Sequence, residues 1–244
     1  MKKVGLGLLA MLTLSEIVYG SVRHSVGLAV SDDDCLTYIE HHQYFESGYH
    51  HIRYYDKEFR VLLAKELRYP ELPQHPAIKQ TDFLQEIETT IQVDGQTGMT
   101  EIAYLRNKKS KNFQFELTEN VVIDAGFDAY IRENWQSFER QPSQEFSLAV
   151  IGKRNLVKMK IVRSDSSVDG ASFSVRPKSW LLRTLVPEIS LRYDGSRQLI
   201  RYKGLSNLKR FGEGRNVVIY FEHYHSELPL SFPLPEWLPE VSRL

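Results

Sequence analysis

Residues 124–141 have the sequence DAGFDAYIRENWQSFERQ, a stretch with a clear helical period. Its aromatic and aliphatic residues recur at intervals of three and four, so they share one face of a helix. Those residues are Phe127, Tyr130, Ile131, Trp135 and Phe138, and the other face carries Asp128, Arg132, Glu133, Gln136 and Glu139. Asp124 is a suitable N-cap, and Pro142 is a suitable stop. We therefore expect an amphipathic helix over 124–139, whose aromatic face packs on a sheet formed by both halves of the chain.

The sequence before this helix has the period-two alternation of strands. Residues 35–45 and 49–56 flank Glu46-Ser47-Gly48, which predicts a hairpin, and a third strand follows over 59–69. Three prolines then exclude regular pairing, so 69–79 is expected to be a connection, and 69–80 is the candidate boundary between two lobes. Further strands are predicted over 87–93, 99–106 and 113–117, with a lysine-rich tip at 107–112 in solvent.

The sequence after the helix again alternates between apolar and polar residues. Strands are predicted over 146–151, 156–162, 171–175, 189–193, 199–202 and 216–221. Ser179 is a suitable cap for a short helix over 179–186, which ends before Pro187. The predicted fold class is mainly β with minor α: a curved antiparallel sheet or half-barrel, closed by the helix at 124–139 and the short helix at 179–186.

The N-terminus is typical of a secretory signal peptide. Lys2 and Lys3 precede an apolar run from Val4 to Leu14, which is too short to span a bilayer. Gly20 suits cleavage before Ser21, so residues 1–20 are expected to be removed on export, leaving no stable membrane span. An uncleaved anchor is the alternative. The mature chain is then a single β-rich domain over 21–226, followed by a tail over 227–244 with four prolines.

Composition excludes some classes of partner. The chain has 244 residues, and 31 Lys and Arg balance 31 Asp and Glu. This balance gives no overall attraction to nucleic acid or to an anionic membrane, so a nucleic-acid partner is not expected. Cys35 has no second cysteine to pair with, and its apolar neighbours are typical of a small buried hydrophobe rather than a nucleophile.

Candidate chemistry is sparse. No P-loop, dinucleotide fingerprint or G-x-S-x-G elbow is present, so neither an enzyme nor a cofactor is predicted. His41-His42 and His50-His51 lie on the two arms of the first predicted hairpin, where one imidazole from each arm would share a side. Two imidazoles fall short of the four ligands of a structural zinc site. We expect surface cross-strand histidines and no metal.

Three segments together resemble a family of proteobacterial periplasmic proteins with a domain of unknown function. They are DAGFDAYIRENW at 124–135, SFSVRPKSWLLRTLVPEISLRYD at 172–194 and RQLIRYKGLSN at 197–207. The resemblance covers most of the mature chain and implies a periplasmic location. It also implies a fold similar to the half-barrels of lipoprotein carriers, in which a curved sheet is plugged by short helices. The cavity of those carriers takes acyl chains, but none of their binding residues can be matched here.

Aromatic and aliphatic residues on the predicted strands and helices are candidates for lining an apolar cavity. They are Phe113, Phe115, Phe127, Ile131, Trp135, Phe138, Phe146, Phe173 and Trp180. A filled core is the other interpretation of the same pattern. The first hypothesis is therefore a periplasmic, non-enzymatic binding or carrier protein for a hydrophobic, lipid-like molecule. The second is a cell-envelope module that meets a protein partner through exposed strand edges and the proline-rich tail.

Overall fold

The computed structural model describes residues 22–224 except 70–71, 95–96, 107–108, 152–154, 168, 184–186 and 211–212. The predicted signal peptide at 1–20 and the predicted tail at 227–244 lie outside the described residues. The strands are β1 (Arg23–Val30), β2 (Leu36–Tyr44), β3 (Tyr49–Tyr55), β4 (Val61–Arg68), β5 (Ala77–Asp82), β6 (Ile87–Val93), β7 (Met99–Arg106), β8 (Lys109–Glu116), β9 (Val121–Ile123), β10 (Ser143–Ala149), β11 (Val157–Ser167), β12 (Gly170–Pro177), β13 (Ile189–Asp194), β14 (Leu199–Arg210) and β15 (Glu213–Tyr224). The helices are α1 (Gly126–Glu133), α2 (Trp135–Arg140) and α3 (Trp180–Arg183).

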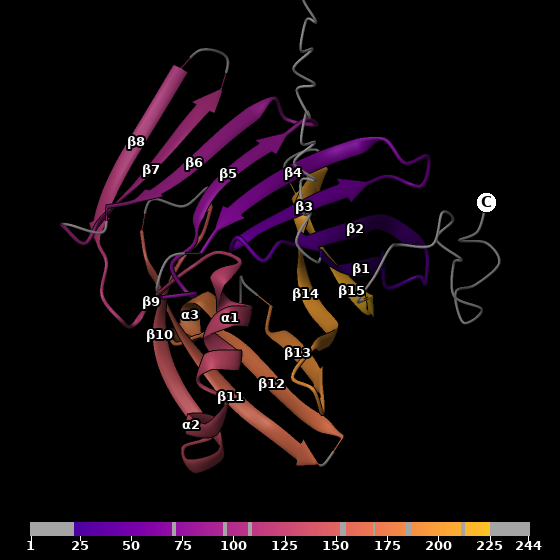
Figure 1. Ribbon diagram of the computed structural model, residues 1–244, viewed down its shortest axis with the longest axis vertical. Helices are drawn as coiled ribbons and strands as arrows, with labels where there is room; N and C mark the ends of the chain where they lie inside the picture. Colours follow the sequence, from indigo (N-terminus) through magenta and orange to yellow (C-terminus); the bar gives the residue numbers. More distant parts are fainter. Residues whose placement is uncertain are drawn as a thin grey trace, which may run out of the picture.

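All fifteen described strands belong to one curved, open sheet (Figure 1). Its order is β8-β7-β6-β5-β4-β3-β2-β1-β15-β14-β13-β12-β11-β10-β9, so β1–β8 form an N-terminal wing and β9–β15 a C-terminal wing. Neighbours are antiparallel apart from β9 and β10, which are parallel. The predicted fold class is confirmed: the protein is mainly β, with a curved sheet that is not closed into a barrel.

The two wings meet at a seam between β1 and β15. Their register runs from His24 opposite Tyr224 to Val30 opposite Val218, so strands from the two ends of the described chain pair side by side. Gly27 in β1 lies under the ring of Phe221, and a Cβ there would come within 2.6 Å of that ring. Glycine is therefore the residue that permits this close approach at the seam.

The aromatic face of α1 and α2 packs on the C-terminal wing. Ile131, Trp135 and Phe138 are buried in one cluster with side chains of β9–β13, among them Phe146 and Phe173. The expected sheet from both halves of the chain is found, but this face packs on its C-terminal half alone. The predicted helix is also interrupted at Asn134, whose side-chain Nδ2 donates to the Tyr130 carbonyl at 2.9 Å. The N-cap is Ala125 rather than Asp124.

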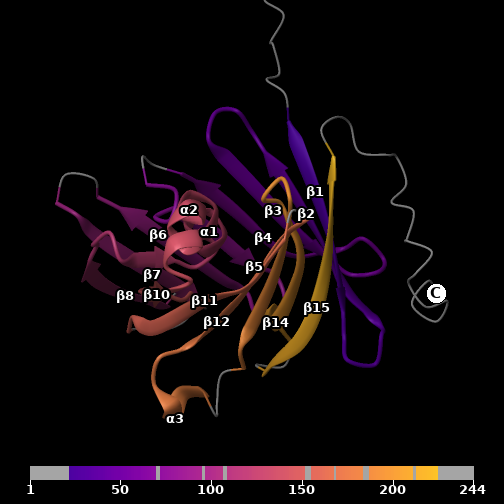
Figure 2. The same ribbon diagram turned by 90° about the horizontal axis from the view of Figure 1, so that it is seen from below.

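A second core cluster joins the wings. Ile52, Leu63 and Ile91 of the N-terminal wing are buried together with Ile123 and Ile219 of the C-terminal wing. The connection before β5 strengthens this contact, because the Gln74 carbonyl accepts from the Ile123 amide at 3.0 Å. The sheet is thus curled so that its concave faces oppose each other, with α1 and α2 between the wings (Figure 2).

Most predicted strands are found, with corrections to two strands and to the second predicted helix. β5 begins inside the predicted connection at 69–79, because Pro76, the last of the three prolines, lies just outside the strand and leaves Ala77 free to pair. β8 begins at Lys109, inside the predicted solvent tip at 107–112. The predicted helix at 179–186 is described as α3 over Trp180–Arg183, and 184–186 lie outside the described residues.

Candidate functional site

A cavity of about 1170 Å³ lies between the concave faces of the two wings and is bounded by α1. Its lining is contributed by all the strands except β9, so it is a product of the curled sheet as a whole. Small-molecule sites usually occupy roughly 300–1,000 Å³. The cavity is therefore large enough for a ligand of the size of a lipid chain or a drug.

The cavity has two chemically different sides. The C-terminal wing supplies an apolar wall, formed by Leu148, Val150, Ile151, Val157, Met159, Pro177, Ile189, Leu205 and Ile219, and the β13–β15 part of this wing adds polar side chains beside it, among them Arg197, Tyr202, Asn207 and His223. The N-terminal wing, Asp124 and the polar face of α1 supply a polar wall, formed by Glu40, His42, Tyr44, His50, Lys65, Tyr69, Gln80, Thr89, Tyr104, Asp124, Asp128 and Arg132. A ligand in this space would meet hydrocarbon on one side and charged or hydroxyl groups on the other.

The polar wall includes a buried ion pair between the two wings. Lys65 in β4 donates from Nζ to Oδ2 of Asp124 at 2.7 Å, and its side chain is only 3% exposed. Asp124 has a φ of 38°, an uncommon conformation for a residue other than glycine. Its amide donates to the Ala149 carbonyl, which helps to hold this conformation. An ammonium group this far from water requires a close counter-charge, and Asp124 provides it.

The polar face of α1 also points into the cavity. Arg132 and Asp128 form an ion pair at 2.8 Å, one helical turn apart. The Tyr193 hydroxyl donates to the other Asp128 oxygen at 2.9 Å, which links the helix to β13. Asp128 raises the pKa of the Arg132 guanidinium above its usual value. The helix therefore serves two environments: its aromatic face fills a core, and its charged face lines the cavity.

A chain of hydrogen bonds runs along the polar wall from Glu40 to Tyr69. Glu40 Oε2 lies 3.0 Å from His42 Nε2, and His42 Nδ1 lies 3.0 Å from His50 Nε2. His50 Nδ1 is in turn 3.2 Å from the Tyr69 hydroxyl. The β2–β3 register explains the contact: His50 is opposite Tyr44, so it is a diagonal neighbour of His42 on the same face. The Tyr44 ring stacks on His50, with 4.1 Å between centroids.

One proton arrangement satisfies every bond in this chain. A carboxylate only accepts, so with Glu40 ionised His42 donates from Nε2, and its bare Nδ1 accepts from His50. His50 then accepts the Tyr69 proton at its own Nδ1. Burial lowers the pKa of His50 and raises the pKa of Tyr69, which favours the neutral imidazole and the protonated phenol that this arrangement needs. The expectation of surface histidines is wrong for His41 and His50, which are both buried.

The same chain of hydrogen bonds explains why the imidazole rings of these histidines do not converge on a common point. Both ring nitrogens of His42 are engaged, one by Glu40 and one by His50. Among the residues that the structure describes, no group of three or more His, Cys, Asp or Glu side chains could hold a metal ion. His41 lies on the other face of β2, where it pairs with His24 at 3.0 Å.

The residues predicted from the sequence to line a cavity are found in four environments. Phe113 and Phe127 line the cavity. Ile131, Trp135, Phe138, Phe146 and Phe173 are buried in the helix core, and Phe115 packs on the core that joins the wings. Trp180 is 76% exposed. The apolar wall is formed mainly by Leu, Val, Ile and Met side chains of the C-terminal wing that were not among the predicted candidates.

Sequence reasoning also missed the polar wall, although β4 carried a signal. Leu63, Leu67 and Tyr69 share the apolar face of the predicted strand, and Lys65 stands between them in the same phase. A single charge on an otherwise apolar strand face faces either water or a buried partner, and here it faces Asp124. None of the described helices is both long and apolar enough to cross a bilayer.

Comparison with known proteins supports the fold alone. No protein-family model and no curated protein matches the sequence. Among solved structures, the chain is similar to a beta-barrel-like protein of domain of unknown function DUF1849 from Brucella abortus. The TM-score is 0.50 at 8% sequence identity, over 86% of this chain and 100% of that one. The similarity is thus to a domain of unknown function with a comparable β architecture, as the three resembling segments implied.

Proposed function

We propose that the protein is an exported, periplasmic, non-enzymatic binding or carrier protein for an amphipathic, lipid-like ligand. The observation that supports this most directly is the cavity of about 1170 Å³ with one apolar and one polar wall. A hydrocarbon chain on the apolar wall would remove its surface and that of the wall from water, at roughly 25 cal/mol per Å². The polar wall would meet the head group of the same molecule.

The charges around the cavity favour an anionic head group. Seven cationic side chains line it, against four carboxylates. The cations are Arg23, Lys65, Arg106, Lys109, Lys111, Arg132 and Arg197, and the carboxylates are Glu40, Asp82, Asp124 and Asp128. Two of the carboxylates are engaged by Lys65 and Arg132, so the cations of the lining remain in excess. Such a surplus attracts a carboxylate or phosphate more than a neutral or cationic group.

Two measurements test this proposal. Native mass spectrometry and organic extraction of the purified protein are expected to recover a bound amphipathic molecule, and a fluorescent fatty acid is expected to bind. Leu148→Trp fills the cavity from the apolar wall and should weaken that binding about tenfold or more. Ser147→Trp on the same strand is the matched control, because Ser147 points to the opposite face. A protein free of ligand that binds no fatty acid would contradict the proposal.

A second function, a protein-interaction module, is favoured by one specific observation. β8 is the last strand of the N-terminal wing and pairs only with β7 among the described strands, so its outer backbone groups are open to a further strand. A photo-crosslinking residue at exposed Asn112 should then capture a partner in cells, whereas one at exposed Glu222 should not. Equal capture at both positions would count against this function.

A further inference from the structure

The connection between β12 and β13 carries an apolar tip that extends away from the sheet. α3 consists of Trp180, Leu181, Leu182 and Arg183, and it projects beyond the ends of β12 and β14 in Figure 2. Trp180 is 76% exposed and Leu181 is 58% exposed, and no residue of α3 is buried. Exposure of three neighbouring large apolar side chains on one short element is costly in water, so it indicates a contact surface.

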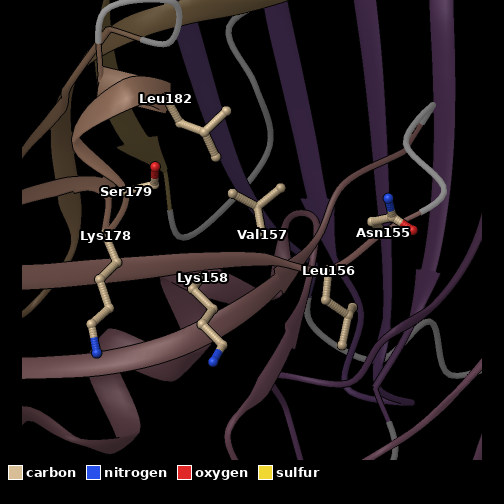
Figure 3. Close-up of a pocket in the computed structure, with 7 residues that line it drawn as sticks. All are labelled: Asn155, Leu156, Val157, Lys158, Lys178, Ser179 and Leu182. Carbon is tan, nitrogen blue, oxygen red and sulfur yellow. The ribbon is translucent and has the colours of Figure 1, made fainter.

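Basic residues surround the base of this tip. Lys158 and Lys178 project in the same direction beside the tip, as Figure 3 shows, and the Lys178 amide donates to the Lys158 carbonyl. Lys160 and Arg176 face each other on the same side of β11 and β12. The nearby carboxylate of Glu145 pairs with Lys178 at 2.7 Å, and Lys178, Lys160 and Lys158 together lower its pKa. Arg176 pairs with Glu188 at 3.5 Å, so these four cations outnumber the two carboxylates beside them.

Size and shape distinguish between the surfaces that this element could contact. A stable protein interface buries roughly 800 Å² on each partner, more than one turn of helix can offer. A protruding tip with a Trp, two Leu and flanking cations instead has the composition of a segment that lies in the interfacial region of a bilayer. We propose that α3, with Lys158 and Lys178 beside it, docks the protein onto the surface of an anionic phospholipid bilayer.

The tip is adjacent to the cavity. A pocket of about 640 Å³ separates α3 from β11, and Val157 lines both this pocket and the cavity. Leu182 and Val157 point toward each other across this pocket in Figure 3. Docking through α3 would bring the apolar wall close to the lipid phase, a consequence that rests on the proposed function. The docking itself does not need a ligand and is tested without one.

The test is sedimentation of the full chain, as purified from cells, with phosphatidylcholine vesicles and with vesicles containing 30% phosphatidylglycerol. Binding is expected to be about tenfold or more tighter to the anionic vesicles, and to weaken from 50 to 500 mM salt. Lys158→Gln and Lys178→Gln should each weaken it by about fivefold. Trp180→Ser with Leu181→Ser should abolish most of it.

The matched control is Phe83→Ser with Leu84→Ser, which removes an exposed aromatic and a neighbouring exposed leucine from the turn after β5. This variant should bind anionic vesicles like the parent chain. The proposal is overturned if the parent chain binds neither vesicle, if lipid charge makes no difference, or if both pairs of substitutions weaken binding equally. Circular dichroism of each variant checks that the sheet is retained.

Discussion

The ion pair between Lys65 and Asp124 makes the sharpest prediction at the scale of single residues. Asp124→Asn keeps the shape of the side chain but leaves the Lys65 ammonium, 3% exposed, without a counter-charge. We expect the free energy of unfolding to fall by about 3 kcal/mol or more in urea titrations at pH 7. Adding Lys65→Met should recover part of that loss, because the double variant buries no charge. Equal losses in the single and double variants would contradict this account.

Buried histidines make stability depend on pH. Burial lowers the pKa of His41 to about 4, and burial also lowers the pKa values of His50, His75 and His223. Each imidazole therefore binds a proton more readily in the unfolded chain, so the contribution of each is fully present above the unfolded pKa of about 6.5 and is lost as the pH falls. Thermal unfolding should move to lower temperature between pH 7 and pH 5.

The contribution of His41 to this pH dependence of stability can be measured separately. By pH 5, the proton that the unfolded chain takes up at this position should cost about 1–2 kcal/mol of stability. His41→Gln should therefore show a smaller loss of unfolding free energy between pH 7 and pH 5 than the parent chain. Urea titrations at the two pH values measure both losses. Parallel losses in the two proteins would mean that His41 takes up its proton equally well in the folded state.

At the scale of elements, the start of α1 is fixed by contact rather than by helix propensity. A Cβ on Gly126 would lie 2.5 Å from the Gln74 carbonyl oxygen, so the first turn presses against the connection before β5. Replacing glycine with alanine in a helix usually stabilises it by about 1 kcal/mol. Here we expect Gly126→Ala to destabilise the protein by about 1–3 kcal/mol in urea titrations, because backbone must move. A Gly126→Ala variant more stable than the parent chain would contradict this close contact with Gln74.

Elements with a one-sided pattern and clear turns could be predicted from the sequence, and others could not. The β6 and β7 bounds, Ile87–Val93 and Met99–Arg106, match the predicted ranges. β5 was missed because the prolines before it predicted no pairing over the whole segment. A proline excludes pairing only at its own position, and Pro76 lies just outside the strand. The break at Asn134 was missed because the aromatic period continues through it.

The candidate site was harder to predict than the elements, for a reason that belongs to the fold. Periodicity separates the two faces of a strand, but it does not say which face becomes concave or what lies across the cavity. Lys65 and Asp124 are 59 positions apart, and the contact between them exists only because the sheet curls. The sequence therefore indicated an interior between sheet and helix, whereas the polar half of that interior could be seen only in three dimensions.

At the scale of the whole molecule, the net charge of zero conceals where the charges lie. A balanced total predicted no attraction to an anionic surface. In the fold, Lys158 and Lys160 of β11, Arg176 of β12 and Lys178 just after β12 lie close together on one face of the C-terminal wing. Total charge sets long-range behaviour, but a docking surface responds to the charges within about 10 Å of it. A chain with zero net charge can therefore still carry a locally positive docking surface.

The seam between β1 and β15 makes the last prediction, which concerns how the molecule folds. Every other pair of neighbouring strands in the sheet is consecutive in the sequence, whereas the seam joins residues such as Ala29 and Ile219 from the two ends of the described chain. Closing so long a loop costs conformational entropy, and the contacts that offset this cost form only after closure. The seam should therefore form late. Ile219→Val removes one methylene at the seam, and Ile78→Val does the same in the local meander of the N-terminal wing.

Both variants should lose about 1 kcal/mol of unfolding free energy, but through different rates. We expect Ile219→Val mainly to speed unfolding and Ile78→Val to slow folding more, as stopped-flow fluorescence over a range of urea concentrations would show. If Ile219→Val slows folding as much as Ile78→Val does, the seam is already formed in the transition state. The wings would then come together early, and the cavity between them would be enclosed before the strands at its outer edges are in place.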